Sequence, residues 1–129
     1  MSGPPRPPTR SMPSEREATS RWLTDIRHHI VMAEGFATGM AYATFKDDNL
    51  RLYAVIRCLE IISEASRRLP EALKDRHPVI QWKGMAAAGN IYRHEYEDVA
   101  AREVWDTLTL HLPPLRAVVE AELAALGDA

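Results

Sequence analysis

Several features are scarce in this 129-residue sequence, and each scarcity narrows the class of protein. The single cysteine, Cys58, excludes an internal disulfide, and we expect it in the core because it lies in an apolar helical pattern. No stretch approaches the roughly 20 apolar residues of a membrane span, and the N-terminus lacks the apolar core of a secretory signal. We therefore expect a cytoplasmic protein without a membrane partner.

Excess positive charge and metal-ligand patterns are missing as well. Lys and Arg number 16 against 18 Asp and Glu, so the net charge of −2 offers nucleic acid no bulk attraction. Any RNA contact must therefore come from a local cluster. His28 and His29 point roughly 100° apart on a helix and have no other ligand near them in sequence, which favours surface or boundary histidines. We expect neither a metal nor a cofactor.

Alternating strand patterns of useful length are also absent, whereas apolar residues recur at helical spacing. Residues 1–13 hold five of the nine prolines and are expected to form a disordered tail, followed by one domain over residues 14–129. The predicted fold is all-α, an up-and-down bundle of four to five helices. The expected helices run from Ser14 to about Gly39, from Asp47 or Asp48 to Pro70, from Val79 into the segment 90–96, and from about Ala100 to Gly127 with a kink or break at Pro113-Pro114.

Polar, chemically capable side chains gather in the segment Asn90-Ile91-Tyr92-Arg93-His94-Glu95-Tyr96. On a continuous helix, Asn90 and His94 share a face because they are four positions apart. Three interpretations stay open. The segment is a polar helix end, or it performs acid–base chemistry on RNA with His94 transferring protons and Arg93 offsetting phosphate charge, or it forms a non-catalytic interaction surface.

Small residues directly precede this segment, at Ala86-Ala87-Ala88-Gly89. Glycine costs about 1 kcal/mol in a helix relative to alanine, so Gly89 is expected to have a packing reason.

From about Trp22 onward, ordered motifs resemble the HepT-like proteins of the HEPN superfamily. They are Ala54-Val55-Ile56-Arg57 followed by Ile61-Ile62-Ser63-Glu64-Ala65, then Pro78-Val79-Ile80-Gln81-Trp82-Lys83-Gly84-Met85, then Asn90, His94-Glu95-Tyr96 and Val104-Trp105. The resemblance implies a small helical bundle that forms a homodimer and cleaves RNA, with tRNA as one candidate substrate. It also implies a toxin that needs no metal, and a minimal nucleotidyltransferase antitoxin as its partner.

Carried over by position, the resemblance implies that His94 is the catalytic histidine, Asn90 the asparagine ahead of it, and Tyr96 the tyrosine that the antitoxin adenylylates. The family's essential arginine falls on Gly89, which leaves Arg93 as the nearest guanidinium for the phosphate. If Gly89 marks a vacated catalytic position and its helix tolerates the bulk, Gly89→Arg should raise activity. The alternative is a cleavage-deficient protein that retains only nucleotide or partner binding.

Overall fold

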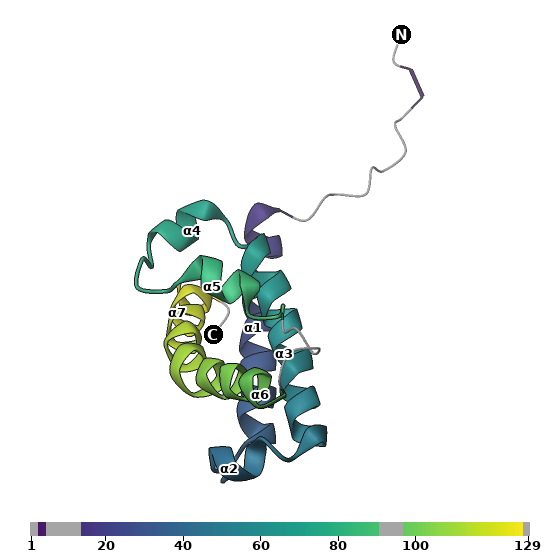
Figure 1. Ribbon diagram of the computed structural model, residues 1–129. Coiled ribbons are helices and arrows are strands. Elements are labelled where there is room, and N and C mark those ends of the chain that lie inside the picture. The colour runs from purple at the N-terminus through teal and green to yellow at the C-terminus, as the bar shows by residue number, and fades with distance from the viewer. Residues whose placement is uncertain (1–2, 5–13, 91–96, 128–129) are drawn as a thin grey trace.

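The computed structural model describes residues 3–4, 14–90 and 97–127, with the backbone alone for Glu97 and Asp98 (Figure 1). Nearly all of the expected tail, and the segment 91–96, lie outside the described residues. Within them the chain is helical and contains no strand, so the all-α prediction is confirmed. The helical segments are α1 Glu15–Phe36, α2 Tyr42–Phe45, α3 Asn49–Arg68, α4 Glu71–Asp75, α5 Trp82–Ala87, α6 Glu97–Asp106, the π-helical η1 Thr107–His111, and α7 Leu112–Ala125.

The ends of α1 and α3 follow local side-chain chemistry. Ser14 accepts a hydrogen bond from the Glu17 backbone N–H at 3.1 Å, which starts α1, and Asp48 accepts one from the Arg51 N–H at 3.1 Å, which starts α3. After α3 the chain turns extended at Leu69 and Pro70, because a residue before proline avoids the helical region. Both predicted N-caps and the predicted stop at Pro70 are confirmed.

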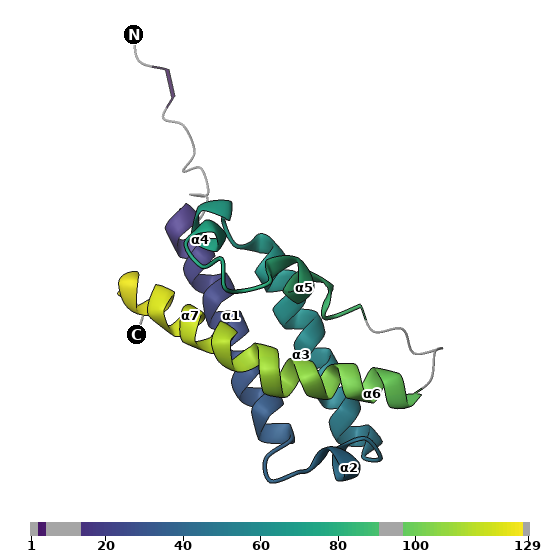
Figure 2. The ribbon, with the colours of Figure 1, turned by 60° about the vertical axis from the view of Figure 1, so that its left-hand side comes forward.

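The core lies between α1, α3 and the C-terminal helices. α1 and α3 lie side by side and run in opposite directions, and the continuous path of α6, η1 and α7 crosses both of them (Figure 2). Each contributes an apolar stripe at helical spacing, as periodicity predicts. Cys58 is 3 % exposed, which confirms its expected core position, and burial raises the pKa of its thiol. Fully buried side chains include Leu23, Ile26, Ile30, Val55, Leu59, Ile62, Val104, Leu112, Leu115, Val119 and Leu123.

The helical path continues through the region of Pro113-Pro114, but its hydrogen bonding changes there. α6 ends at Asp106, η1 follows, and the two prolines fall in the first turn of α7. The Leu112 N–H donates to the Thr107 carbonyl, a π-type bond to the fifth residue back. Prolines are tolerated in a first helical turn because N–H groups there need no helical partner. The predicted kink or break is therefore a change of helical register that begins before the prolines.

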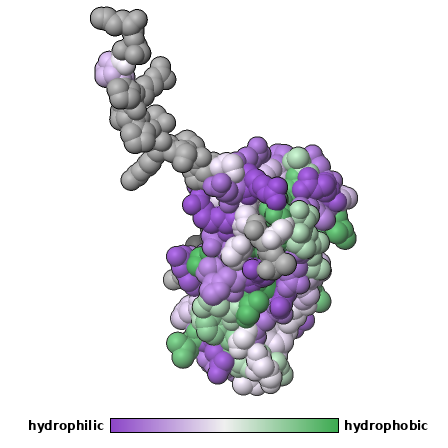
Figure 3. Space-filling model, turned by 180° about the vertical axis from the view of Figure 1, so that it is seen from behind, coloured by the Kyte–Doolittle hydropathy of each residue, from purple (hydrophilic) through white to green (hydrophobic). Residues whose placement is uncertain are grey.

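The outer surface is mixed in polarity. Figure 3 shows hydrophilic residues over much of the upper part of one face, with hydrophobic residues in separate patches. Across the described ranges, no helix combines the length and the apolar character needed to cross a membrane.

Candidate functional site

The segment that leads to Asn90 is less helical than its sequence predicts. α5 stops at Ala87, Ala88 and Gly89 form a turn, and the Asn90 N–H donates to the Ala87 carbonyl at 2.9 Å. The expected helix from Val79 through Asn90 is therefore wrong, and so is the expectation that Asn90 stands on a continuous helix with His94. The physical reason lies in Gly89, a poor helix former packed against α3, and in Ser63 and Arg67 of α3, which hold the last carbonyls of α5.

Side chains of α3 hold the C-terminal turn of α5. Ser63, which is 1 % exposed, donates from Oγ to the Met85 carbonyl at 2.9 Å. Arg67 donates from Nη1 to the Ala86 carbonyl at 2.6 Å. The last carbonyls of a helix have few partners within it: the Met85 carbonyl also accepts from the Ala88 N–H at 3.2 Å, and the donors from α3 add to the hydrogen bonding of this turn. They also fix where the chain leaves α5 toward Asn90.

Gly89 packs directly against the backbone of α3. A Cβ atom built there would lie 2.9 Å from Glu60 Cα and 3.1 Å from Ser63 Oγ. Contacts this short require the α5 turn or α3 to move, so the expected packing reason for Gly89 is confirmed. The expected gain in activity from Gly89→Arg required that the chain tolerate a larger side chain there. This condition is not met, because the position has no room even for a methyl group. We therefore correct that expectation: Arg at position 89 should disturb the site.

Arg67 is itself held by an acidic neighbour on α3. Glu64 accepts from Arg67 Nη2 at 2.9 Å and from Arg68 Nε at 3.0 Å. The hydrogen bond from Arg67, followed by that from Arg68, lowers the pKa of the Glu64 carboxyl. Glu64 thus keeps the Arg67 guanidinium oriented toward the end of α5.

A second anchor ties the turn before α5 to α7. Glu122 is 9 % exposed and accepts from Arg76 Nη2 at 2.9 Å, while its other oxygen lies 2.6 Å from His77 Nε2. The hydrogen bond from Arg76 is the largest cause of a lowered pKa for Glu122. Because Arg76 and His77 precede α5, this cluster and the α3 donors hold the segment from both sides.

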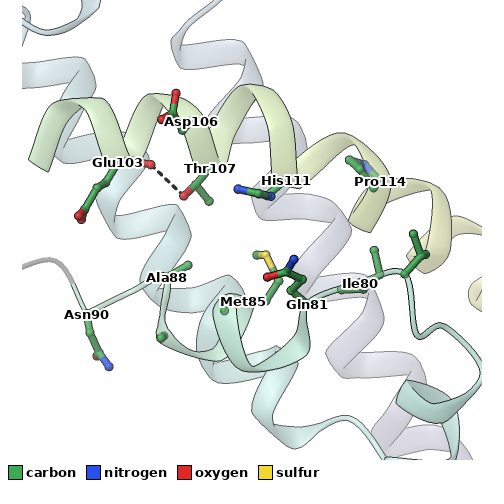
Figure 4. Close-up of a pocket in the computed structure, with 13 residues that line it drawn as sticks. Ile80, Gln81, Met85, Ala88, Asn90, Glu103, Asp106, Thr107, His111 and Pro114 are labelled. Atoms are coloured by element: carbon green, nitrogen blue, oxygen red, sulfur yellow. Dashed lines mark hydrogen bonds between the residues drawn. The ribbon is translucent and has the colours of Figure 1, made fainter. Parts of the chain in front are cut away.

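A groove of about 410 Å³ separates residues 79–90 from α6 and η1 (Figure 4). Asn90 is exposed at one end of this groove, and its side chain points away from α6. The lining residues are Val79, Ile80, Gln81, Gly84, Met85, Ala87, Ala88, Asn90, Glu103, Asp106, Thr107, His111 and Pro114. The structure therefore places one predicted site residue at a hollow of ligand size.

The other predicted site residues, Arg93, His94 and Tyr96, lie outside the described residues, so their relation to Asn90 stays a prediction. His28 is exposed and His29 is half-buried, with its Nδ1 at 2.7 Å from the Asp25 carbonyl. No group of three His, Cys, Asp or Glu side chains is placed to hold a metal ion within the ranges that the structure describes.

The sequence analysis assigned no role to Ser63 and Arg67, which support the site, or to Gln81, which lines the groove, although Ser63 and Gln81 stand in the quoted motifs. Ser63 lies 22 positions from its acceptor, and Arg67 lies 19 positions from its own. Long-range contacts of this kind leave no local pattern. The one available signal was the small-residue run, which indicates a close approach of two backbones without naming the partner.

The described part of the chain is an all-α bundle in which a short helix, α5, leads to Asn90 at the end of a groove, and this places it among small helical proteins. Comparison with known families identifies it further: the ribonuclease HepT-like family model matches residues 26–122, and the chain belongs to this family. The resemblance drawn from the sequence is thereby confirmed.

Curated relatives agree with this assignment. A protein of Thermococcus cleftensis named probable ribonuclease HepT is 36% identical over 99 residues, which cover 77% of this chain and 90% of the relative. A putative RNase of Methanocaldococcus jannaschii is 30% identical over 99 residues, covering 77% of this chain and 82% of the relative. A second putative RNase of that organism is 31% identical over 107 residues, or 83% of this chain and 92% of the relative. No solved structure matches the chain.

Proposed function

We propose that this protein is a ribonuclease that cleaves RNA without a metal ion. The observation that carries the proposal is membership of the ribonuclease HepT-like family along residues 26–122, together with relatives that are named probable or putative RNases. The exposed position of Asn90 at the end of the groove supports it, because the chain passes from there directly into residues 91–96.

The proposed mechanism divides two tasks between side chains. His94 transfers protons, a role that suits an imidazole because its ordinary pKa is close to neutral pH. Arg93 contacts the phosphate and offsets the charge that builds on it during cleavage, while Asn90 orients the reacting groups. The described lining of the groove contains Glu103 and Asp106 but neither Lys nor Arg. Charge compensation must therefore come from outside the groove, and Arg93 is the nearest candidate in sequence.

The test is cleavage of a total tRNA pool in the presence of EDTA, comparing wild type with His94→Ala and Arg93→Ala. We expect cleavage by wild type, none by His94→Ala, and a rate reduced roughly 10²–10³-fold in Arg93→Ala, as for other lost charge contacts. His28→Ala, at an exposed histidine on α1, is the matched control and should cleave like wild type. Equal rates for wild type and His94→Ala, at buffer background, would refute the proposal.

A second candidate function is favoured by the packing of Gly89. The family's arginine has no place in this backbone, since a Cβ there would lie 2.9 Å from Glu60 Cα. A protein without that arginine can bind nucleotides or a partner while cleaving nothing. RNA binding by wild type without cleavage, unchanged in His94→Ala, would support this second function over the first.

We further propose that the protein is the cytoplasmic toxin of a toxin–antitoxin pair, with a minimal nucleotidyltransferase as antitoxin. The support is the family assignment and the position of Tyr96 two residues after His94. Adenylylation of Tyr96 would add a bulky anion beside the imidazole and exclude RNA by size and charge. Incubation with the nucleotidyltransferase encoded beside this gene and ATP should add AMP that mass spectrometry maps to Tyr96. A Tyr96 left unmodified by an active transferase would remove this mode of regulation.

A further inference from the structure

The groove beside Asn90 has the size and lining of a ligand site that the proposed mechanism does not use. Its floor is apolar, with Met85 4 % and Ile80 7 % exposed. Figure 4 shows Gln81 and Met85 directed from the α5 side toward the α6–η1 wall, where His111 faces them. An apolar floor with a few polar groups around it is the usual composition of a small-molecule pocket.

The charged side chains in the described lining of the groove disfavour a phosphate as its occupant. Glu103 and Asp106 both line it, and among the described lining residues there is no Lys or Arg. Asp106 Oδ1 lies 3.3 Å from Arg102 Nε, so its charge is partly offset, whereas Glu103 points from α6 toward the Ala88–Asn90 end (Figure 4). The part of a ligand that enters the groove is therefore uncharged or positive.

The hydrogen bonding of the α6–η1 wall favours a ligand that donates. Thr107 Oγ1 gives its hydrogen to the Glu103 carbonyl at 2.9 Å, so only its lone pairs remain for a ligand. The Glu103 carboxylate accepts and does not donate, and the Gln81 amide can do both. An amino group finds the Glu103 carboxylate and the Thr107 lone pairs as acceptors, whereas a carbonyl oxygen placed against Glu103 would meet no donor there and would have to turn to Gln81 or His111.

We propose that the groove is a subsite for an amino-bearing nucleobase of the RNA strand, that is adenine, cytosine or guanine rather than uracil. The ring lies over Met85 and Ala88, and its amino group donates to the Glu103 carboxylate at the Asn90 end of the groove. This inference rests on the proposed function, because Asn90 leads from the groove into the segment that carries Arg93 and His94. The bound base would select which phosphate reaches that segment.

The sharpest probe is a pair of nucleosides, cytidine and uridine, added to the full-length protein and followed by backbone amide NMR. The two have nearly the same shape, carry no phosphate, and differ at C4 by an amino group against a carbonyl oxygen. Cytidine should shift the amide signals of Met85, Ala88 and Thr107 and bind roughly tenfold more tightly than uridine. In Glu103→Gln the difference between the nucleosides should largely disappear, whereas the control Glu71→Gln, on α4, should retain it.

Two outcomes would overturn the subsite. One is equal binding of cytidine and uridine, or shifts confined to residues outside the groove. The other is a concentration at which the groove signals shift and cytidine no longer moves them, which would mean that a second copy of the chain fills the groove. Because the nucleosides are not cleaved, binding is scored separately from activity. Cytidine in the groove with no tRNA cleavage would refute the ribonuclease, and cleavage with no nucleoside preference would refute the subsite.

Discussion

Gly89 and Ser63 meet where the turn after α5 presses against α3. The short distances from a built Cβ at Gly89 to Glu60 Cα, 2.9 Å, and to Ser63 Oγ, 3.1 Å, make this the tightest of the described glycine positions. Tight packing of a turn on a helix backbone transmits any change directly to Asn90, the next residue. The contact therefore bears on both stability and the site.

Substitution at Gly89 should destabilise the fold. Gly89→Ala is expected to lower the free energy of unfolding by about 1–3 kcal/mol, because an inserted methyl group in a packed place forces its surroundings to move. Gly89→Arg should lower it at least as much and should not raise RNA cleavage. Gly35→Ala is the matched control, since a Cβ at Gly35 in α1 meets nothing within 4 Å. There alanine should be neutral or stabilising by up to about 1 kcal/mol. Urea denaturation of the variants checks this, and a Gly89→Arg that is both stable and more active would contradict it.

Two buried serines on α3 offer a second paired comparison. Ser63 and Ser66 are each 1 % exposed, but Ser63 donates to the Met85 carbonyl, whereas Ser66 Oγ has no hydrogen-bond partner among the described residues. Ser63→Ala should cost about 0.5–1.5 kcal/mol, because the Met85 carbonyl loses its bond from Ser63 and keeps only the one from the Ala88 N–H at 3.2 Å. Ser66→Ala should be neutral or slightly stabilising, because it removes a buried hydroxyl that makes no bond. Thermal unfolding measures the stability of both variants. An equal loss of stability in Ser63→Ala and Ser66→Ala would show that the hydrogen bond of Ser63 does not stabilise the fold.

At the scale of elements, α7 and the turn before α5 are joined through Glu122. Its pKa is lower in the folded protein than in the unfolded chain, mainly because Arg76 donates to it. The unfolded state therefore binds more protons over the acid range. The stability contributed by Glu122 is present above its ordinary pKa, near 4.5, and is lost as pH falls through the lower value of the folded state.

The corresponding prediction concerns acid unfolding. Glu122→Gln should destabilise the protein by roughly 1–3 kcal/mol at neutral pH and should flatten the decline of stability below the ordinary carboxyl pKa. Glu120→Gln, on the same helix in a bridge of 3.0 Å with Arg116, is the control and should leave the decline intact. Denaturation curves collected from acid to neutral pH compare the three proteins. An unchanged pH slope in Glu122→Gln would rule out the Glu122 cluster as the source.

The sequence predicted the ends of a helix where the residues that determine those ends lie close by in sequence. Ser14, Asp48 and Pro70 act within a few residues of themselves, so the ends of α1 and α3 could be predicted. The apolar stripes likewise predicted the core. α5 could not be bounded in this way, because its end depends on Ser63 and Arg67, which lie on another helix.

For the candidate site, too, local features could be predicted from the sequence and long-range contacts could not. Asn90 could be singled out from its neighbours in sequence, and Gly89 could be recognised as a packing position from the small residues before it. Position 89 lies against Glu60 Cα and has no room for arginine. This could be recognised only from the arrangement of α3 and α5 in space. The groove depends on residues from 79–90 and from α6, η1 and α7 together, so no single stretch of sequence predicts it.

At the scale of the whole molecule, we predict a symmetric homodimer that brings two copies of the segment 90–96 into one cleft. The prediction follows from the family assignment and from the need of RNA cleavage for more than one proton-transfer group. Light scattering at micromolar concentration should give about twice the 14.5 kDa of one chain. A monomer throughout this range would argue against a site shared between subunits.

The contact at Gly89 also constrains the order in which mutations can accumulate. Its nearest obstacle is the Cα atom of Glu60, which every residue type possesses, so no exchange of side chain at position 60 makes room. An arginine at position 89 becomes acceptable only after the turn and α3 have moved apart, and that movement by itself brings no guanidinium. A mutation to arginine at position 89 and a mutation that moves the turn away from α3 are therefore epistatic. A mutational scan should find position 89 as intolerant as a core position, and directed evolution should regain arginine there only through paired changes.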